Sequence, residues 1–420
     1  MIFALDPLFT DGLDLGDFGW VIVKAVVAFV FLLVAVMLNI WFLRKVIADF
    51  QNRIGPSMAG KWGILQSLAD GIKLFMKEDL IPDKSDRFVF KLAPYLSLIP
   101  AFLVFAIVPL GGNFNESRVM EDGTTQTGVF GWGDNFTYLQ VADPPVGILF
   151  FLAMSSLAIY GIMLAGWGSG SKYPLLGAVR ASAQMISYEA ALGLAIASVV
   201  LFSGSLSTHD IVAQQAGEGF GGIIPNWNLV LTGVIPFVIF LIAGTAELNH
   251  PPFDLVEAEQ ELVGGFHTEY SSIRFALFFL AEFMNQITMS AIAVTLFLGG
   301  PAGPVLFGPD SVAWVWGIVW FFLKLMFFLW ALVWVRATLP RFRYDQLMDL
   351  GWKVLIPAAL GWFLVLAGLR VGDANNWDGG QTALFLIACA AVGLVLWNLL
   401  MLAVRAARQE RLEQEGVDHG

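Results

Sequence analysis

Two long apolar segments enclose the stretch Glu247-Leu-Asn-His-Pro-Pro-Phe-Asp-Leu-Val-Glu-Ala-Glu-Gln-Glu-Leu-Val-Gly-Gly-Phe-His-Thr-Glu-Tyr270. This acidic loop holds six carboxylates, which are Glu247, Asp254, Glu257, Glu259, Glu261 and Glu269. No Lys or Arg occurs from Ala181 to Ile273, so the neighbouring sequence offers these acids no counter-ion. Crowded carboxylates without cations repel one another, which raises their pKa values toward neutral pH. We therefore expect the acidic loop to exchange protons.

The composition of the whole chain is that of a polytopic membrane protein. Of its 420 residues, 57% are hydrophobic and only 14% are charged, and the mean hydropathy is +0.73. A soluble domain has about a quarter charged residues. The formal net charge of -11 argues against nucleic acid as a partner, because nucleic-acid-binding surfaces are basic.

Residues that bind redox cofactors are scarce. The single cysteine, Cys389, allows neither an internal disulfide nor an iron–sulfur centre. The four histidines (His209, His250, His267 and His419) fall in predicted loops or the tail, so no span supplies the axial ligands of a haem. No P-loop or dinucleotide fingerprint occurs, and the histidine spacing matches no standard metal motif. We predict no flavin, haem, iron–sulfur or metal site, so any electron carriers belong to other polypeptides.

Apolar runs of the length needed to cross a bilayer, about 20 residues, predict an all-α transmembrane bundle of nine spans. The runs are 20–43, 92–110, 146–167, 186–202, 229–246, 275–298, 312–335, 354–369 and 382–404. With an outer N-terminus and alternating loops, 19 of the 23 basic residues fall on the inner side and only Arg118 and Arg370 on the outer side. The positive-inside rule requires this distribution. We expect the acidic loop and the C-terminus on the cytoplasmic side.

The same pattern divides the chain into four parts. An outer acidic N-terminus (1–19) precedes the membrane core (20–370), an additional C-terminal span (371–404) and a charged cytoplasmic tail (405–420). Two cytoplasmic features belong to the core: the acidic loop, 247–273, and the segment 64–77. Apolar residues recur at helical spacing in 64–77, which predicts an amphipathic helix on the membrane surface. A short helix packed under the bundle is the alternative.

Three glutamates lie within predicted spans or at their ends. Glu189 is near the start of the fourth span, Glu247 ends the fifth, and Glu282 lies about two turns into the sixth. Carboxylates at membrane depth are costly and are usually functional. Each could instead cap a helix or bind a backbone group, but three acids at similar depth beside an acidic loop favour a proton relay. Lys324, in the seventh span, could pair with one of them.

At these positions the sequence resembles a known family, the H subunits of proton-pumping NADH:quinone oxidoreductase, or respiratory complex I. The resemblance covers about residues 44–357 and rests on Arg53-Ile-Gly-Pro56, on 65–78, on 172–189, on Ala246-Glu-Leu-Asn-His-Pro-Pro-Phe-Asp254, on 257–271 and on Arg336-Ala-Thr-Leu-Pro-Arg-Phe-Arg-Tyr-Asp-Gln-Leu-Met348. It implies a subunit of the bacterial plasma (inner) membrane that anchors the hydrophilic electron-transfer arm and adjoins small and antiporter-like membrane subunits. The subunit would contribute to the chamber and the lipid-facing entrance for the substrate quinone, which is ubiquinone or menaquinone.

The resemblance also implies roles for individual residues. Glu189, Glu247 and Glu282 would carry protons within the membrane, and Asp254, Glu257, Glu259, Glu261 and Glu269 would form an acidic funnel leading from the quinone. The quinone chamber and its entrance would be bordered by Arg53, Gly55, Pro56, Phe253 and Arg274.

Two other functions compete with this interpretation. A related subunit anchors energy-converting hydrogenases and formate-hydrogen lyases, and the soluble subunits that co-purify with the chain would distinguish that role. A stand-alone cation/proton transporter could also use buried acids, with Lys324 as a switching charge. Such a transporter would catalyse exchange when reconstituted alone.

Overall fold

The computed structural model describes residues 15–114, 117–119, 125–132, 135–217, 226–255, 263–306 and 313–417. The chain forms two compact units, 1–356 and 357–420. In the described residues, seven helices are long and apolar enough to cross a membrane, and two shorter apolar helices accompany them. Each of the nine predicted spans overlaps one of these nine helices, so the predicted helical membrane fold is confirmed at this level.

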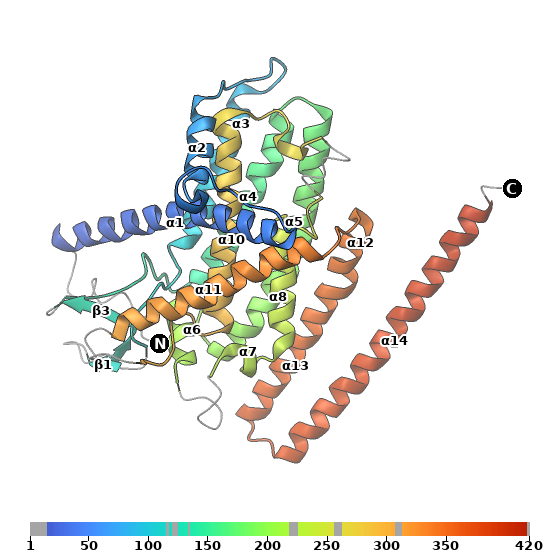
Figure 1. Ribbon diagram of the computed structural model, residues 1–420. Coiled ribbons are helices and arrows are strands. Elements are labelled where there is room, and N and C mark those ends of the chain that lie inside the picture. Colours follow the sequence, from blue (N-terminus) through green and yellow to red (C-terminus); the bar gives the residue numbers. More distant parts are fainter. Residues whose placement is uncertain are drawn as a thin grey trace. The chain divides into compact units, whose positions relative to one another are not determined.

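The first unit is mainly helical (Figure 1). Its helices are α1 (Leu15–Phe50), η2 (Lys61–Gly63), α2 (Gln66–Met76), α3 (Arg87–Phe105), α4 (Gly147–Gly168), α5 (Lys172–Ser203), α6 (Thr208–Gln215), α7 (Asn228–Leu231), α8 (Val234–Glu247), η4 (Gly265–His267), α10 (Ser272–Phe297), α11 (Ala313–Thr338), α12 (Tyr344–Asp349) and the π-helix η6 (Leu350–Leu355). In Figure 1, α1 and α11 run obliquely across the more upright α10.

The connection between α3 and α4 adds a β component that the sequence did not predict. Two antiparallel hairpins pair β1 (Ser117–Val119) with β2 (Thr125–Thr127), and β3 (Val129–Trp132) with β4 (Asn135–Tyr138). The strands have three or four residues each. Strands this short give too little alternation of apolar and polar residues to be seen in a sequence pattern.

Helix α10 forms the centre of the first unit. Most of its apolar window is buried, and it contacts α1, α2, α3, α5, α6, α7, α8 and α11. A helix that is apolar on every side is typical of a buried position. In contrast, α1 buries one stripe, which includes Leu32, Val36, Asn39 and Leu43 and recurs every three or four residues. Polar side chains in the second half of α10, such as Gln286 and Ser290, are therefore surrounded by protein.

Small residues bring the helices beside α4 close together. A Cβ at Gly161 would collide with Ser97 Oγ on α3, and a Cβ at Gly166 would collide with the Ala178 side chain on α5. Close approach through glycine is a common mode of packing between membrane helices. As a result, α4 lies directly between α3 and α5.

The predicted amphipathic helix is present as α2. None of its residues is buried, and Leu68, Ile72 and Phe75 expose large apolar side chains. Ser67 Oγ donates to the Met37 carbonyl of α1 (2.9 Å), and Ser272 Oγ of α10 donates to the Leu74 carbonyl (2.9 Å). Helix α2 is thus attached at both ends, and its location on a membrane surface stays a prediction.

The fifth predicted span, 229–246, is interrupted. Helix α7 ends at Leu231, and α8 begins after Gly233, whose φ of 79° lies in the left-handed region that favours glycine. Helix α8 therefore has 14 residues and is one of the two shorter apolar helices.

The second unit contains α13 (Ile356–Ala374) and α14 (Gly379–Val417). The turn between them is closed by Trp377, whose backbone N–H donates to the Gly372 carbonyl (3.0 Å) and whose ring packs edge-on against Phe385. Helix α14 has 39 residues, which at 1.5 Å per residue is about twice the thickness of the hydrocarbon core.

Candidate functional site

Two consecutive serines of α4 hold the acids Glu247 and Glu189. Ser155 Oγ donates a hydrogen bond to Glu247 Oε1 at the end of α8, and Ser156 Oγ does the same to Glu189 Oε1 on α5. Neighbouring residues of a helix point about 100° apart, so the pair can reach two different helices. Glu247 is buried and Glu189 half-buried, and the charge of Glu189 acts on Glu247. Neighbouring residues of one helix therefore bind both acids.

Two cavities border Glu247, and one of them also reaches the third acid. One of about 60 Å³ is lined by both Glu247 and Glu282, and one of about 30 Å³ also borders Glu247 and lies beside Ser155. Each exceeds the space that a water molecule needs, about 10–15 Å³. Glu247 Oε2, which is buried, has no hydrogen-bond partner among the described residues. We call the series Glu189, Ser156, Ser155, Glu247, the two cavities and Glu282 the acid path.

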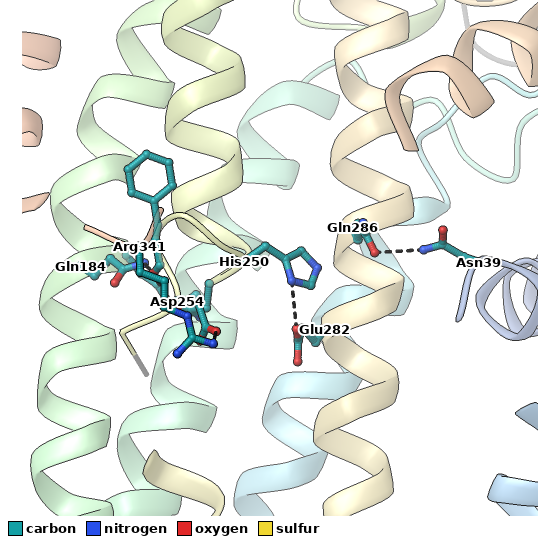
Figure 2. Close-up of polar contacts among 10 residues, drawn as sticks. Asn39, Gln184, His250, Asp254, Glu282, Gln286 and Arg341 are labelled. Carbon is teal, nitrogen blue, oxygen red and sulfur yellow. Dashed lines mark hydrogen bonds and ion pairs between the residues drawn. The ribbon is translucent and has the colours of Figure 1, made fainter. Parts of the chain in front are cut away.

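Glu282 makes a contact with the loop that follows α8. The Nδ1 atom of His250 lies 3.3 Å from Glu282 Oε1 (Figure 2). Burial, and next the charge of Arg336, lower the pKa of His250 to about 3. The imidazole is therefore neutral at pH 7, so the contact is not an ion pair, and Nδ1 lies close enough to the carboxylate to donate a hydrogen bond to it.

One amide contact joins α10 to α1. Asn39 Nδ2 donates to Gln286 Oε1 (2.9 Å), and both residues are buried. Figure 2 shows Gln286 one turn along α10 from Glu282, with His250 between the two side chains. The sequence did not point to Ser155, Ser156, Asn39 and Gln286, because a single polar residue in an apolar run has no pattern of its own.

Asp254 corrects the expectation that the acidic loop lacks cations. Its carboxylate is almost fully buried and forms an ion pair with Arg341 (2.9 Å), from the connection between α11 and α12 (Figure 2). The neighbouring sequence could not reveal this cation because Arg341 is distant along the chain. Glu269 is partly exposed. Glu257, Glu259 and Glu261 lie outside the described residues, so their role in a funnel stays a prediction.

Hydrogen bonds and ring contacts fix the loop on either side of these residues. Gln184 Nε2 on α5 donates to the carbonyls of Ala246 (2.8 Å) and Phe253 (2.9 Å). Tyr270 stacks on Phe90, with ring centroids 4.0 Å apart, and its hydroxyl donates to the Phe90 carbonyl (3.1 Å). Both ends of the loop are therefore held by the helix bundle.

The five residues predicted to contact quinone occupy different environments. Arg53, Gly55 and Pro56 line one open groove together with Arg44 and Asp70, which form an ion pair of 2.6 Å.

Neither of the other two predicted quinone contacts lines this groove. Phe253 is buried against the rings of Tyr188 and Phe342. Arg274 pairs with Asp79 (2.9 Å). These two residues position the loop and the start of α10.

Lys324 does not pair with an acid of the path. Its ammonium donates to the carbonyls of Leu298 (2.7 Å), Gly300 (2.8 Å) and Ala302 (2.8 Å), at and beyond the C-terminal end of α10. Three donors and three acceptors match, and the negative end of the helix dipole favours a cation. The pairing that the sequence left open is not formed, and Lys324 instead caps α10.

The described part of the chain contains no group of three or more His, Cys, Asp or Glu residues that could hold a metal ion. What it contains is a set of protonatable and hydroxyl side chains joined by hydrogen bonds and water-sized cavities. Hydroxyls, carboxyls and water can pass protons along hydrogen bonds. Fold and site together define a multi-pass helical membrane protein with acids between its helices.

Comparison with known proteins identifies the family. The profile of the NADH dehydrogenase family matches residues 23–367. The H subunit of the NADH-quinone oxidoreductase of Frankia alni is 47% identical over 96% of this chain and 84% of its own length. The H subunits of Streptomyces avermitilis and Cutibacterium acnes are 47% and 45% identical, over 91% and 90% of this chain and 81% and 84% of their own lengths.

The chain belongs to the family of NADH-quinone oxidoreductase H subunits. It is a multi-pass membrane subunit of that enzyme complex, and other subunits of the complex are its partners.

Proposed function

We propose that this subunit forms part of the quinone chamber and couples quinone reduction to proton movement through the acid path. The observation that carries the proposal is the continuity of the path. Consecutive serines join Glu189 and Glu247, and a cavity of about 60 Å³ joins Glu247 and Glu282. A subunit that only anchored other proteins would have no need of three acids connected in this way.

The coupling step follows from the chemistry of quinones. Reduction of a quinone to a quinol consumes protons, and in a poorly solvated chamber it creates transient negative charge. Such charge changes the proton occupancy of nearby carboxyls. The loop that contains Asp254 would transmit this change to Glu247, since the loop begins where α8 ends and is held there by Gln184.

The groove at Arg53, Gly55 and Pro56 is the proposed quinone entrance. It is open, adjoins α2 with its exposed apolar face, and contains a guanidinium that could bind a polar quinone head group. The positive-inside distribution of Lys and Arg supports an outer N-terminus and a cytoplasmic C-terminus in a bacterial plasma membrane. On that side the hydrophilic arm of the complex would bind.

Replacement of Glu247 by Gln tests the proposal. We expect NADH oxidation with a soluble acceptor to persist, because that reaction reports assembly of the complex, and quinone-dependent proton pumping in membrane vesicles to fall at least tenfold. Asp373→Asn, an exposed acid-to-amide change in the second unit, is the matched control. Pumping by the Glu247 variant at the level of the control would refute the acid path.

A further inference from the structure

A buried arm of polar side chains extends from the acid path to α1. It consists of Glu282, His250, Gln286 and Asn39 (Figure 2). Glu282 and Gln286 are four residues apart on α10 and therefore lie on the same face of the helix. His250, Gln286 and Asn39 are all at most 4% exposed. Buried polar groups at this density are costly unless they are hydrogen-bonded to one another.

The direction of each hydrogen bond in the arm follows from its donor atoms. Gln286 uses Oε1 to accept from Asn39 Nδ2, so its amide N–H₂ group remains to serve another acceptor. The neutral imidazole donates from Nδ1 to Glu282, which leaves Nε2 as an acceptor. Nε2 has no partner within hydrogen-bonding distance among the described residues, and Gln286 is a neighbouring side chain that acts on the ring. The Asn39 amide therefore donates toward α10, and Nδ1 of His250 faces Glu282.

Charged and titratable groups lie beside the arm on several elements. Arg336, near the end of α11, acts on His250 and opposes a positive imidazole. Glu247 and His267 face Glu282 across the larger cavity. Burial lowers the pKa of His267 to about 4, a shift that the charge of Asp254 partly offsets, so that this ring is also neutral at pH 7. The groups that face Glu282 across the cavity are thus an acid and a neutral ring, and the Nδ1–H group of His250 is a donor 3.3 Å from its carboxylate.

We propose that His250 is a positioning residue for proton transfer, which orients and stabilises the ionised Glu282 carboxylate through Nδ1 and is itself oriented from α1 through Asn39 and Gln286. The inference rests on the proposed function, because it assigns His250 a task in the acid path. The loop after α8 and helix α1 are both connected to Glu282 through this arm. A shift of either element therefore changes the contact between His250 Nδ1 and the Glu282 carboxylate.

Three replacements of His250 separate this role from simple packing. In His250→Asn the amide nitrogen can occupy the place of Nδ1, and in His250→Gln it occupies the place of Nε2. His250→Phe keeps a ring and removes both nitrogens. Each variant is made in the full chain within the assembled complex, and His209→Gln, which replaces another buried histidine, in α6, is the control. Proton pumping and quinone-dependent NADH oxidation are measured in membrane vesicles from pH 5.5 to 8.5, normalised to NADH oxidation by a soluble acceptor.

Loss of the Nδ1 donor makes the Glu282 carboxylate harder to form. We expect the acid limb of the pumping profile to move by about one pH unit to higher pH in the Phe and Gln variants, which is about tenfold less pumping at the acid end. The Asn variant should keep the profile of the parent. Equal profiles for the Asn and Phe variants, or a parent-like profile for Phe, would overturn the inference.

A second background separates failure of this inference from failure of the proposed function. In Glu282→Gln, replacement of His250 by Phe should cause no further change, since its effect passes through Glu282. A further shift in that background would overturn the positioning role while leaving the acid path in place. Full pumping by Glu282→Gln alone would instead refute the part of the acid path that leads to Glu282.

Discussion

Replacement of Ser155 by Ala removes the hydrogen bond that the serine hydroxyl donates to the buried carboxyl of Glu247. Oε1 accepts from the serine hydroxyl, and Oε2 has no partner among the described residues. A hydrogen bond to a charged group contributes about 1.5–3 kcal/mol. At 1.36 kcal/mol per factor of ten, its loss disfavours the ionised form of Glu247 by about 10- to 150-fold.

The consequence is measurable as a pH-dependent loss of coupling. We expect Ser155→Ala to pump protons at least tenfold more slowly than the parent at pH 7 and to recover as the pH is raised by one to two units. Ser155→Thr keeps the hydroxyl and should retain most of the pumping. Ser156→Ala should have a smaller effect, because Glu189 is only half-buried and can be solvated in part.

The assay is NADH-driven proton uptake by inverted membrane vesicles, normalised to NADH oxidation with a soluble acceptor. Ser198→Ala is the matched control, because Ser198 is also buried within a helix but donates only to the Leu194 carbonyl of its own helix (3.1 Å). If Ser155→Ala and Ser198→Ala pump alike across the pH range, the serine does not serve Glu247, and the reasoning from the hydrogen bond is wrong.

Two further predictions concern stability. Arg341→Gln removes the ion pair with the buried Asp254 carboxylate and should cost about 1–3 kcal/mol, less than loss of a fully buried pair because Arg341 is half-exposed. Asp254→Asn in the same chain should restore the thermal inactivation midpoint of the purified complex, and a double variant no more stable than Arg341→Gln would contradict this. His267 has a folded pKa of about 4 against 6.5 in the unfolded chain, so its stabilising contribution is complete above pH 6.5 and is lost by about 1.4 kcal/mol per pH unit from pH 6.5 to 4. His267→Gln should flatten this acid loss of thermal stability, and an unchanged slope would count against it.

Helix positions were largely predictable because the bilayer demands a fixed length of apolar residues. Where the prediction differed, a local cause is visible. Helix α5 begins at Lys172, well before residue 186, where the predicted fourth span begins. The first half of the helix contains charged and polar residues, so its sequence is not apolar enough to be recognised as part of a span. The interruption at Gly233 depends on a backbone conformation that hydropathy does not report.

The site was predictable only in part, and the reason is geometric. Glu189, Glu247 and Glu282 stand out because carboxylates are rare in apolar runs, whereas Ser155 and Asn39 do not. Partners such as Arg341 for Asp254 are distant in the sequence and become neighbours only through helix packing. Lys324 shows the opposite case. Its charge within a span suggested a functional role, but its three hydrogen bonds to backbone carbonyls account for its position as a helix cap.

The position of Glu247 at the last residue of α8 gives the acid path a mechanical consequence. The carboxyl end of a helix carries partial negative charge, so an ionised carboxylate there is unfavourable by about 0.3–1 kcal/mol and a protonated one is not. Proton occupancy of Glu247 and the geometry of the helix end are therefore linked, and the linkage is reciprocal. The loop that starts at this helix end carries His250 and Asp254, so a change at one carboxyl can reach Glu282 and Arg341 through a rigidly held segment.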